Sequence, residues 1–187
     1  MSTVAGFATG SDMAGFAIGV ANDGEIRDLV RELKPKSTLS RNAAGDGVAA
    51  RFNRNHSIVS RANNLINKAT PDGVSVVMMD IPDCANAELG TLARAYLSRK
   101  APVVEVAKWT LRRFVTGDSQ ASHDQVVRGV WKRWGRSVRL SIEAYAYALV
   151  RLGLMCIGED GTDSEQDEEC VRVVMERHVA EFQGIAG

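Results

Sequence analysis

The chain has 187 residues, and its 23 Lys and Arg balance its 23 Asp and Glu, so its formal net charge is zero before any of its three His is protonated. This balance argues against a nucleic-acid-binding protein that relies on a large positive net charge. A hydrophobic content of 45% excludes global disorder, and the length suits one domain. The longest apolar stretch, residues 142–157, contains Glu143 and Arg151 and is too short to span a bilayer. We therefore expect no membrane partner.

Residues 1–23 are rich in Gly, Ala, Ser and Thr and contain no Lys or Arg. Such a glycine-rich segment does not nucleate a helix cheaply. Its isolated apolar residues have a purpose only if they dock on another surface, so the segment is predicted to be a flexible arm. A frayed terminus is the alternative explanation of the same composition.

The remainder of the chain has mainly helical patterns. In residues 26–33 the apolar side chains recur at helical spacing behind Asp23, a candidate N-cap, and Pro35 ends the run. Residues 74–81 are the one run typical of a strand or a buried extended segment. Further helices are predicted over residues 58–69, 88–99, 103–116, 124–134, 138–154 and 169–182. The predicted fold class is all-α: a single helical core domain with extended N- and C-terminal arms and at most one short β-hairpin.

Charge is unevenly distributed along this neutral chain. From Arg94 to Arg139, eleven basic residues stand against three acidic ones, which leaves a local charge of +8. Residues 158–169 contain seven acidic side chains and no basic one. Eight unbalanced charges repel one another unless a polyanion neutralises them, so the arginines are predicted to bind nucleic acid. The tryptophans among them share faces with valines, which favours core packing over stacking on bases.

Signals for catalysis are weak. His56, His123 and His178 are isolated, and the glycines form no phosphate-binding loop. Asp80 and Asp83 follow the predicted strand and could bind a metal, although such carboxylates are more often turn formers. The chain is therefore predicted not to be an enzyme, with no catalytic residue, metal or cofactor. An enzyme that uses Asp80, Asp83 or His123 is kept as the weakest alternative.

Four strings occur in an order that suggests a family: NKATPDGVSVVMMD (residues 67–80), PVVEVAKWTLRRF (102–114), RWGRSVRL with AYAYAL (133–149) and FQGIAG (182–187). Together they resemble the coat proteins of flexible filamentous plant viruses, and the potyvirus-like branch is the most similar. In that family a helical core winds with identical subunits around genomic single-stranded RNA. The resemblance implies an inter-subunit arm over residues 1–23, an RNA-binding core over 24–157, and an acidic loop plus C-terminal helix or arm over 158–187.

The resemblance also implies an RNA pocket. Its hydroxyl residue falls on Thr70, where serine is usual, and its arginine falls on Arg112. Glu143 is the acid nearest to the family's aspartate position. Weaker RNA-binding candidates come from the same basic segment: Lys108, Arg113, Arg133, Arg136 and Arg139.

The predicted function is that of a structural viral coat protein that polymerises helically on single-stranded RNA through a basic, sequence-nonspecific groove. Its partners would be RNA and further copies of itself, because head-to-tail contacts that do not close produce a helix. Its expected location is the virion, and the host cytoplasm during assembly. The alternative is a small all-α protein-interaction or regulatory module that binds no RNA.

Overall fold

A computed structural model describes residues 1–10, 13–22, 25–35, 47–70, 73–183 and 185. It contains both strands and helices, so the all-α prediction is wrong. The elements in chain order are β1 (Ser2–Thr9), β2 (Ala14–Asn22), β3 (Glu25–Leu33), α1 (Val48–Ala69), β4 (Val76–Asp80), the 3-10 turn η1 (Cys84–Asn86), α2 (Ala87–Leu97), β5 (Val103–Val106), α3 (Lys108–Thr116), α4 (His123–Trp134), α5 (Ser141–Cys156), α6 (Glu165–Arg177) and α7 (Val179–Gln183).

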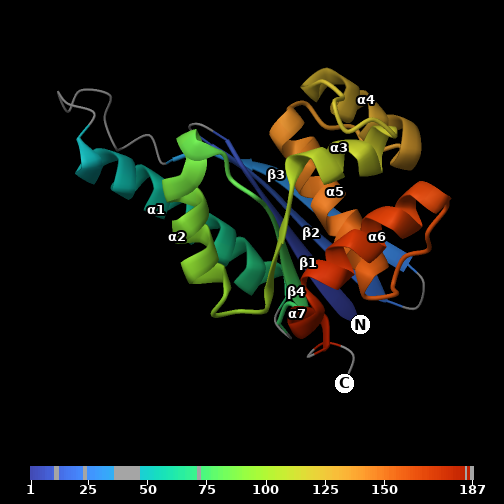
Figure 1. Ribbon diagram of the computed structural model, residues 1–187. Helices are drawn as coiled ribbons and strands as arrows, with labels where there is room; N and C mark the ends of the chain where they lie inside the picture. The colour runs from blue at the N-terminus through green and yellow to red at the C-terminus, as the bar shows by residue number, and fades with distance from the viewer. Residues whose placement is uncertain (11–12, 23–24, 36–46, 71–72, 184, 186–187) are drawn as a thin grey trace.

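The strands form one five-stranded sheet in the order β3-β2-β1-β4-β5. β1, β2 and β3 are antiparallel neighbours, whereas β4 runs parallel to β1 and β5 runs parallel to β4. Helices α1 and α2 cover one face, and α5 lies across the other with α3, α4 and α6 outside it (Figure 1). Alternating side chains of each strand therefore pack into two separate hydrophobic layers, one on each face of the sheet.

The segment predicted to be an N-terminal arm contains the centre of this sheet. β1 pairs with β2 over residues 2–9 and with β4 on its other side, so the predicted extended arm is wrong. Its glycines have a packing role, because Gly6 and Gly15 face α5. A Cβ on Gly6 would collide with the carbonyl oxygen of Ala146, and one on Gly15 would collide with that of Ile142. Glycine lets the helix backbone lie directly on the strands.

The helix predicted over residues 26–33 is also wrong, because this segment is the edge strand β3. Its nine residues pair with β2, and Val30 packs towards α5 while Leu33 packs towards α1 and α2. The apolar spacing fits both periodicities, and pairing with β2 decides between them. The candidate N-cap Asp23 lies outside the described residues.

The strand predicted over residues 74–81 is confirmed as β4, which is fully buried. The helix predicted from residue 103 is wrong at its start, where Val103–Val106 forms β5 and α3 begins only at Lys108. β-branched residues fit a buried, pleated strand better than a helix. The switch from strand to helix therefore occurs at Ala107, beside the end of β4.

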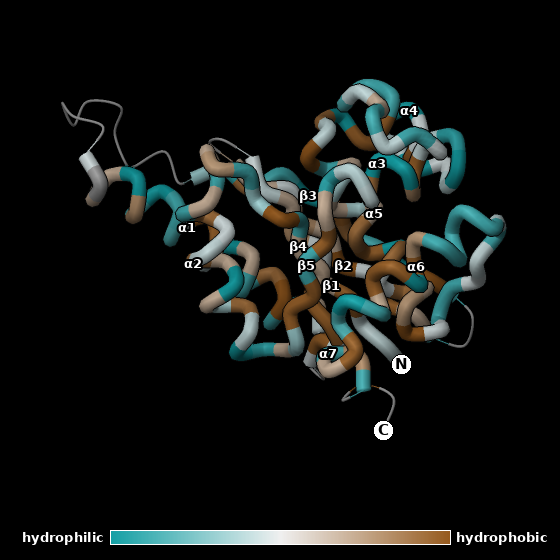
Figure 2. Tube along the Cα trace, in the orientation of Figure 1, coloured by the Kyte–Doolittle hydropathy of each residue, from teal (hydrophilic) through white to brown (hydrophobic). Residues whose placement is uncertain are grey.

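The core is centred on α5, in which nearly every residue from Ile142 to Cys156 is buried. A helix that is apolar on all sides must be enclosed, and Figure 2 shows hydrophobic colour concentrated in α5 and the strands. The helices predicted over 88–99, 124–134 and 138–154 correspond to α2, α4 and α5. Among the described helices, none combines the length and apolar character that crossing a membrane requires.

Candidate functional site at the strand ends

The carboxyl ends of β1, β4 and β5 lie at one edge of the sheet. β1 stops at Thr9 and β4 at Asp80, whose partner in β5 is Val106. Open α/β sheets place ligands outside the carboxyl ends of their parallel strands. We use the name strand-end site for Thr9, Asp80, Asp83 and Lys108, which meet at this edge.

Asp80 is the most enclosed polar group of the strand-end site, with no exposed surface. Its Oδ1 accepts a hydrogen bond from the backbone N–H of Thr9 at 2.8 Å, and its Oδ2 accepts one from the Thr9 hydroxyl at 3.2 Å. Burial raises the pKa of Asp80, while Lys108 and the Thr9 hydrogen bonds act in the opposite direction. The fold thus keeps a carboxyl group with a raised pKa at the place where a ligand would bind.

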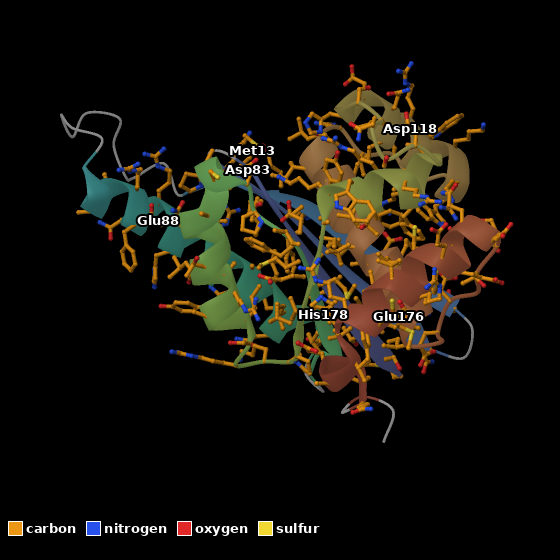
Figure 3. The ribbon with its side chains drawn as sticks, in the orientation of Figure 1. Met13, Asp83, Glu88, Asp118, Glu176 and His178 are labelled. Carbon is orange, nitrogen blue, oxygen red and sulfur yellow. The ribbon has the colours of Figure 1, made fainter. Side chains whose placement is uncertain are left out.

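Lys108 supplies the positive charge of the site. Its Nζ lies 3.4 Å from Oδ2 of Asp80 and 3.5 Å from Oδ2 of Asp83. Asp83 is exposed and caps the turn η1, where its Oδ1 accepts hydrogen bonds from the backbone and side-chain nitrogens of Asn86. Figure 3 shows Asp83 at the same end of the molecule as Met13, away from His178. One lysine therefore bridges a buried and an exposed carboxylate.

Divalent metal ions in proteins are often held by carboxylates, so the donor set of the site is informative. Within the described ranges, no three His, Cys, Asp or Glu side chains come together in a way that could hold a metal ion. Both oxygens of Asp80 already accept hydrogen bonds, and the ammonium of Lys108 lies between the two aspartates. The donors that are present do not fit a divalent metal ion.

A second polar group lies along α3 and the start of α5. Arg112 is one helical turn after Lys108, and its Nε donates a hydrogen bond to the buried hydroxyl of Tyr145 at 3.0 Å. The ring of His123 meets the ring of Tyr145 edge to face. Glu143 accepts hydrogen bonds from the backbone N–H groups of residues 139 and 140 at 2.9 and 3.2 Å. Glu143 thus caps α5 at its N-terminus.

A groove of about 550 Å³ begins beside this cap. It is lined by residues of α4 and of the segment that enters α5, namely Asp124, Val127, Arg128, Arg139, Leu140 and Ser141. The next residue, Ile142, lies against Gly10 just after β1, so the groove adjoins the strand-end site. The exposed side chains of Arg128 and Arg139 form no ion pair with any described residue. The groove therefore offers two exposed guanidinium groups beside the sheet edge, together with the carboxylate of Asp124.

Two of the tryptophans expected in the core are on the surface instead. The side chain of Trp109 is 51% exposed and lies directly after Lys108, and that of Trp131 is 64% exposed. Trp134 contacts Phe114 and Tyr147 and is the one that packs inward. An exposed indole next to a lysine is suitable for stacking on an unpaired base.

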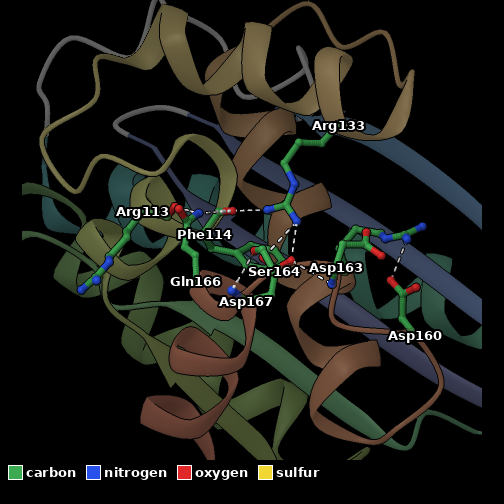
Figure 4. Close-up of polar contacts among 9 residues, drawn as sticks. Arg113, Phe114, Arg133, Asp160, Asp163, Ser164, Gln166 and Asp167 are labelled. Atoms are coloured by element: carbon green, nitrogen blue, oxygen red, sulfur yellow. Dashed lines mark hydrogen bonds and ion pairs between the residues drawn. The ribbon is translucent and has the colours of Figure 1, made fainter.

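Acidic residues elsewhere in the molecule pair with three arginines of the basic segment. Arg133 donates to both oxygens of the buried Asp167 at 2.8 and 2.9 Å and also to the carbonyl oxygen of Phe114 (Figure 4). Glu169 pairs with Arg113 at 2.6 Å. Arg136 pairs with Asp28 of β3 at 2.8 Å. These three pairs therefore compensate part of the local charge of +8 through residues that are distant in the sequence.

The predicted RNA-binding residues fall into four groups. Lys108 and Arg112 lie at or beside the strand-end site, and Glu143 and Arg139 lie at the adjoining groove. Ion pairs hold Arg113, Arg133 and Arg136. Thr70 is buried at the end of α1, where its hydroxyl donates to the carbonyl oxygen of Ile66 at 2.7 Å. The sequence interpretation treats Asp80 as more often a turn former than a site residue. The signal that could have identified it is a carboxylate at the end of a buried strand.

No known protein family matches the chain, and a search of curated proteins finds no relative. Solved structures are similar in fold. RuvC of Thermus thermophilus has a TM-score of 0.54 at 16% identity over 84% of this chain and 97% of RuvC. The same organism's RuvC in complex with a Holliday junction substrate has a TM-score of 0.53 at 20% identity over 80% of this chain and 91% of RuvC.

These likenesses show the fold, and they overturn the resemblance to viral coat proteins. The expected helical polymer on single-stranded RNA and the expected virion location are wrong with it, because both depended on an all-α coat-protein fold. The all-α interaction module is wrong for the same reason. The prediction that nothing points to an enzyme is also wrong, because a protein of this fold has been solved with its substrate.

Proposed function

We propose that this chain binds and processes branched DNA, with the DNA backbone lying along the strand-end site. The observation that carries the proposal is the position of Asp80. This buried carboxyl group ends the parallel strand next to β1, in a fold similar to that of RuvC bound to a Holliday junction. A buried, perturbed carboxyl group at the carboxyl edge of such a sheet is typical of a functional site.

The basic side chains around this edge support a phosphate-binding role. Lys108 and Arg112 lie along α3, while Arg128 and Arg139 line the groove beside α5. Lysine and arginine contacts to phosphates position a protein on DNA without reading its sequence. These four cations would lie along a backbone that passes from the groove to Asp80.

The zero net charge is compatible with this role. The acidic residues Asp167 and Glu169 are paired with Arg133 and Arg113, so their charges are compensated within the molecule. The exposed cations of the groove have no such partner among the described residues. A local positive patch, rather than the total charge, determines how DNA is attracted.

Because Asp80 has no exposed surface, we assign it to holding Lys108 at the reacting phosphodiester rather than to direct contact with the DNA. A labelled four-way junction is incubated with wild type and with Asp80→Asn, and the strands are separated on a denaturing gel. We expect wild type to cut strands near the branch point and Asp80→Asn to bind the junction without cutting it. The matched control is Asp118→Asn, an exposed loop aspartate, and it should cut as wild type does.

Equal cutting by wild type and Asp80→Asn would remove Asp80 from the reaction. Intact strands with wild type would contradict the processing step, whereas failure to retain the junction would contradict the whole proposal.

A further inference from the structure

Lys108 holds an unfavourable position for a lysine, because it is the first residue of α3. The N-terminus of a helix carries partial positive charge, which repels a cation. The side chain nevertheless turns to Asp80 and Asp83, and only 24% of it is exposed. Two carboxylates therefore hold a positive charge at a point where the helix itself disfavours one.

We infer that the ammonium group of Lys108 serves as a built-in cation that takes the place of a divalent metal ion between Asp80 and Asp83. The strand-end site then does not take up Mg²⁺ or Mn²⁺ while Lys108 is in position. This inference rests on the proposed function only in treating the strand-end site as the functional site. Metal binding at that site can be measured without DNA.

The geometry around Asp80 supports the replacement. Nζ of Lys108 is nearly equidistant from the two carboxylates, at 3.4 and 3.5 Å. A metal ion at the same point would meet the ammonium charge at short range, and two cations repel strongly where water is scarce. Asp80 has no exposed surface, so little water can screen this repulsion.

The remaining groups of the site suit an ammonium group better than a metal ion. Mg²⁺ demands near-octahedral coordination by oxygen at about 2.0–2.1 Å. The Thr9 N–H and hydroxyl already donate to the two oxygens of Asp80, and both hydrogen bonds are buried. Across the described residues no third carboxylate joins Asp80 and Asp83. An ammonium group needs only hydrogen-bond acceptors, which the two aspartates provide.

Thermal unfolding with increasing MnCl₂ tests the inference on the full chain. Wild type should show no saturable rise in Tm, because Lys108 already neutralises the site. Lys108→Met keeps most of the side-chain volume but removes the charge, so Asp80 and Asp83 become available to the metal. We expect a saturable Tm increase of about 3–6 °C for this variant when Mn²⁺ is about ten times its Kd.

Two further variants define the origin of the effect. Lys132→Met makes the same change on the exposed face of α4, and it should behave as wild type. The double variant Lys108→Met with Asp80→Asn should lose the Mn²⁺ response. Saturable Mn²⁺ binding by wild type that disappears in Asp80→Asn would overturn the inference, and it would do so even if Lys108→Met failed to fold. A folded Lys108→Met with no Mn²⁺ response would overturn it as well.

Mn²⁺ binding and junction binding, measured on the same protein, separate this inference from the proposed function. A wild-type protein that binds Mn²⁺ at Asp80 and also binds junctions would retain the proposed function but lose the lysine replacement. A protein that binds neither would support the replacement and contradict the proposed function.

Discussion

Asp167 and Asp80 are both fully buried, but the fold holds them in different ways. Asp167 receives two hydrogen bonds from the guanidinium of Arg133, at 2.8 and 2.9 Å, and one from the backbone of residue 163. Asp80 faces a lysine ammonium at 3.4 Å at the open edge of the sheet. One nitrogen of the planar guanidinium reaches both oxygens of Asp167 while another donates to the carbonyl oxygen of Phe114, which fixes the geometry, whereas a lysine contact is a point charge that can change partners.

The comparison distinguishes a buried charge that stabilises the fold, Asp167, from one that is positioned to act on a ligand, Asp80. Asp167 joins α6 to α4, and its other neighbours are residues of the same acidic segment. Asp80 lies where strands end and where exposed cations gather. Burial alone does not identify a functional carboxylate, but burial together with a replaceable partner at a sheet edge does.

Asp167→Asn should produce the largest loss of stability. The substitution removes the charge that compensates Arg133, whose side chain is only 21% exposed. Breaking a buried ion pair on one side costs about 3–5 kcal/mol. Urea unfolding should show this decrease, whereas the exposed Glu168→Gln on the same helix should stay within about 0.5 kcal/mol of wild type. A loss below about 1 kcal/mol for Asp167→Asn would make the network dispensable.

Gly15→Ala should produce the next largest loss of stability, in the part of the molecule that contains Asp80 rather than Asp167. A methyl group there would collide with the backbone of Ile142 at the start of α5, beside the strand-end site. Overpacking of this kind costs about 1–3 kcal/mol. Gly161→Ala is the matched control, because its added carbon meets nothing within 4 Å. Equal stability of the two variants in urea would contradict the packing of β2 against α5.

Arg139→Ala should affect DNA rather than stability. Its exposed guanidinium lines the groove, whereas Arg113 is paired with Glu169. Loss of one phosphate contact lowers the slope of log K against log salt concentration by about 1. Junction titrations at several salt concentrations should show this decrease for Arg139→Ala and an unchanged slope for Arg113→Ala. A larger decrease in the slope for Arg113→Ala than for Arg139→Ala would place the DNA beside the Arg113–Glu169 pair instead of the groove.

The smallest of these expected effects is the change that Asp80→Asn makes in the pH dependence of stability. Burial raises the pKa of Asp80, so the folded chain holds this proton more tightly than the unfolded chain. Wild type therefore loses stability as pH rises through the interval between the ordinary and the raised pKa. Urea unfolding should show wild type gaining stability relative to Asp80→Asn as pH falls into that interval. A constant difference between the two proteins would exclude a raised pKa.

Periodicity predicts the elements whose signal is local. The run before Asp80 is a buried strand as expected, and α4 and α5 follow their apolar patterns. β1 and β2 could not be predicted in this way, because Gly6 and Gly15 have meaning only against α5, which is far away in sequence. In β3 the spacing of Ile26, Leu29 and Leu33 also fits a helix, and only pairing with β2 selects the strand.

The site was predictable in part. Lys108 was a candidate because of its basic surroundings and Arg112 because of the family resemblance, and the structure places both at or beside the strand ends. Counting charge along the chain could not show that Arg113 and Arg133 find acidic partners in α6. The string from residue 102 to 114 resembled a helix entry, but it contains a strand followed by a helix. Short strings carry little information about the fold.

Competition for a labelled four-way junction tests the central claim most directly. Wild type is mixed with the junction, and unlabelled junction, linear duplex of the same sequence or single-stranded RNA is added in turn. We predict that the unlabelled junction displaces the label at a concentration at least about tenfold lower than the duplex does, and that RNA is weaker still. Displacement by duplex or RNA at the same concentration as the junction would contradict the account.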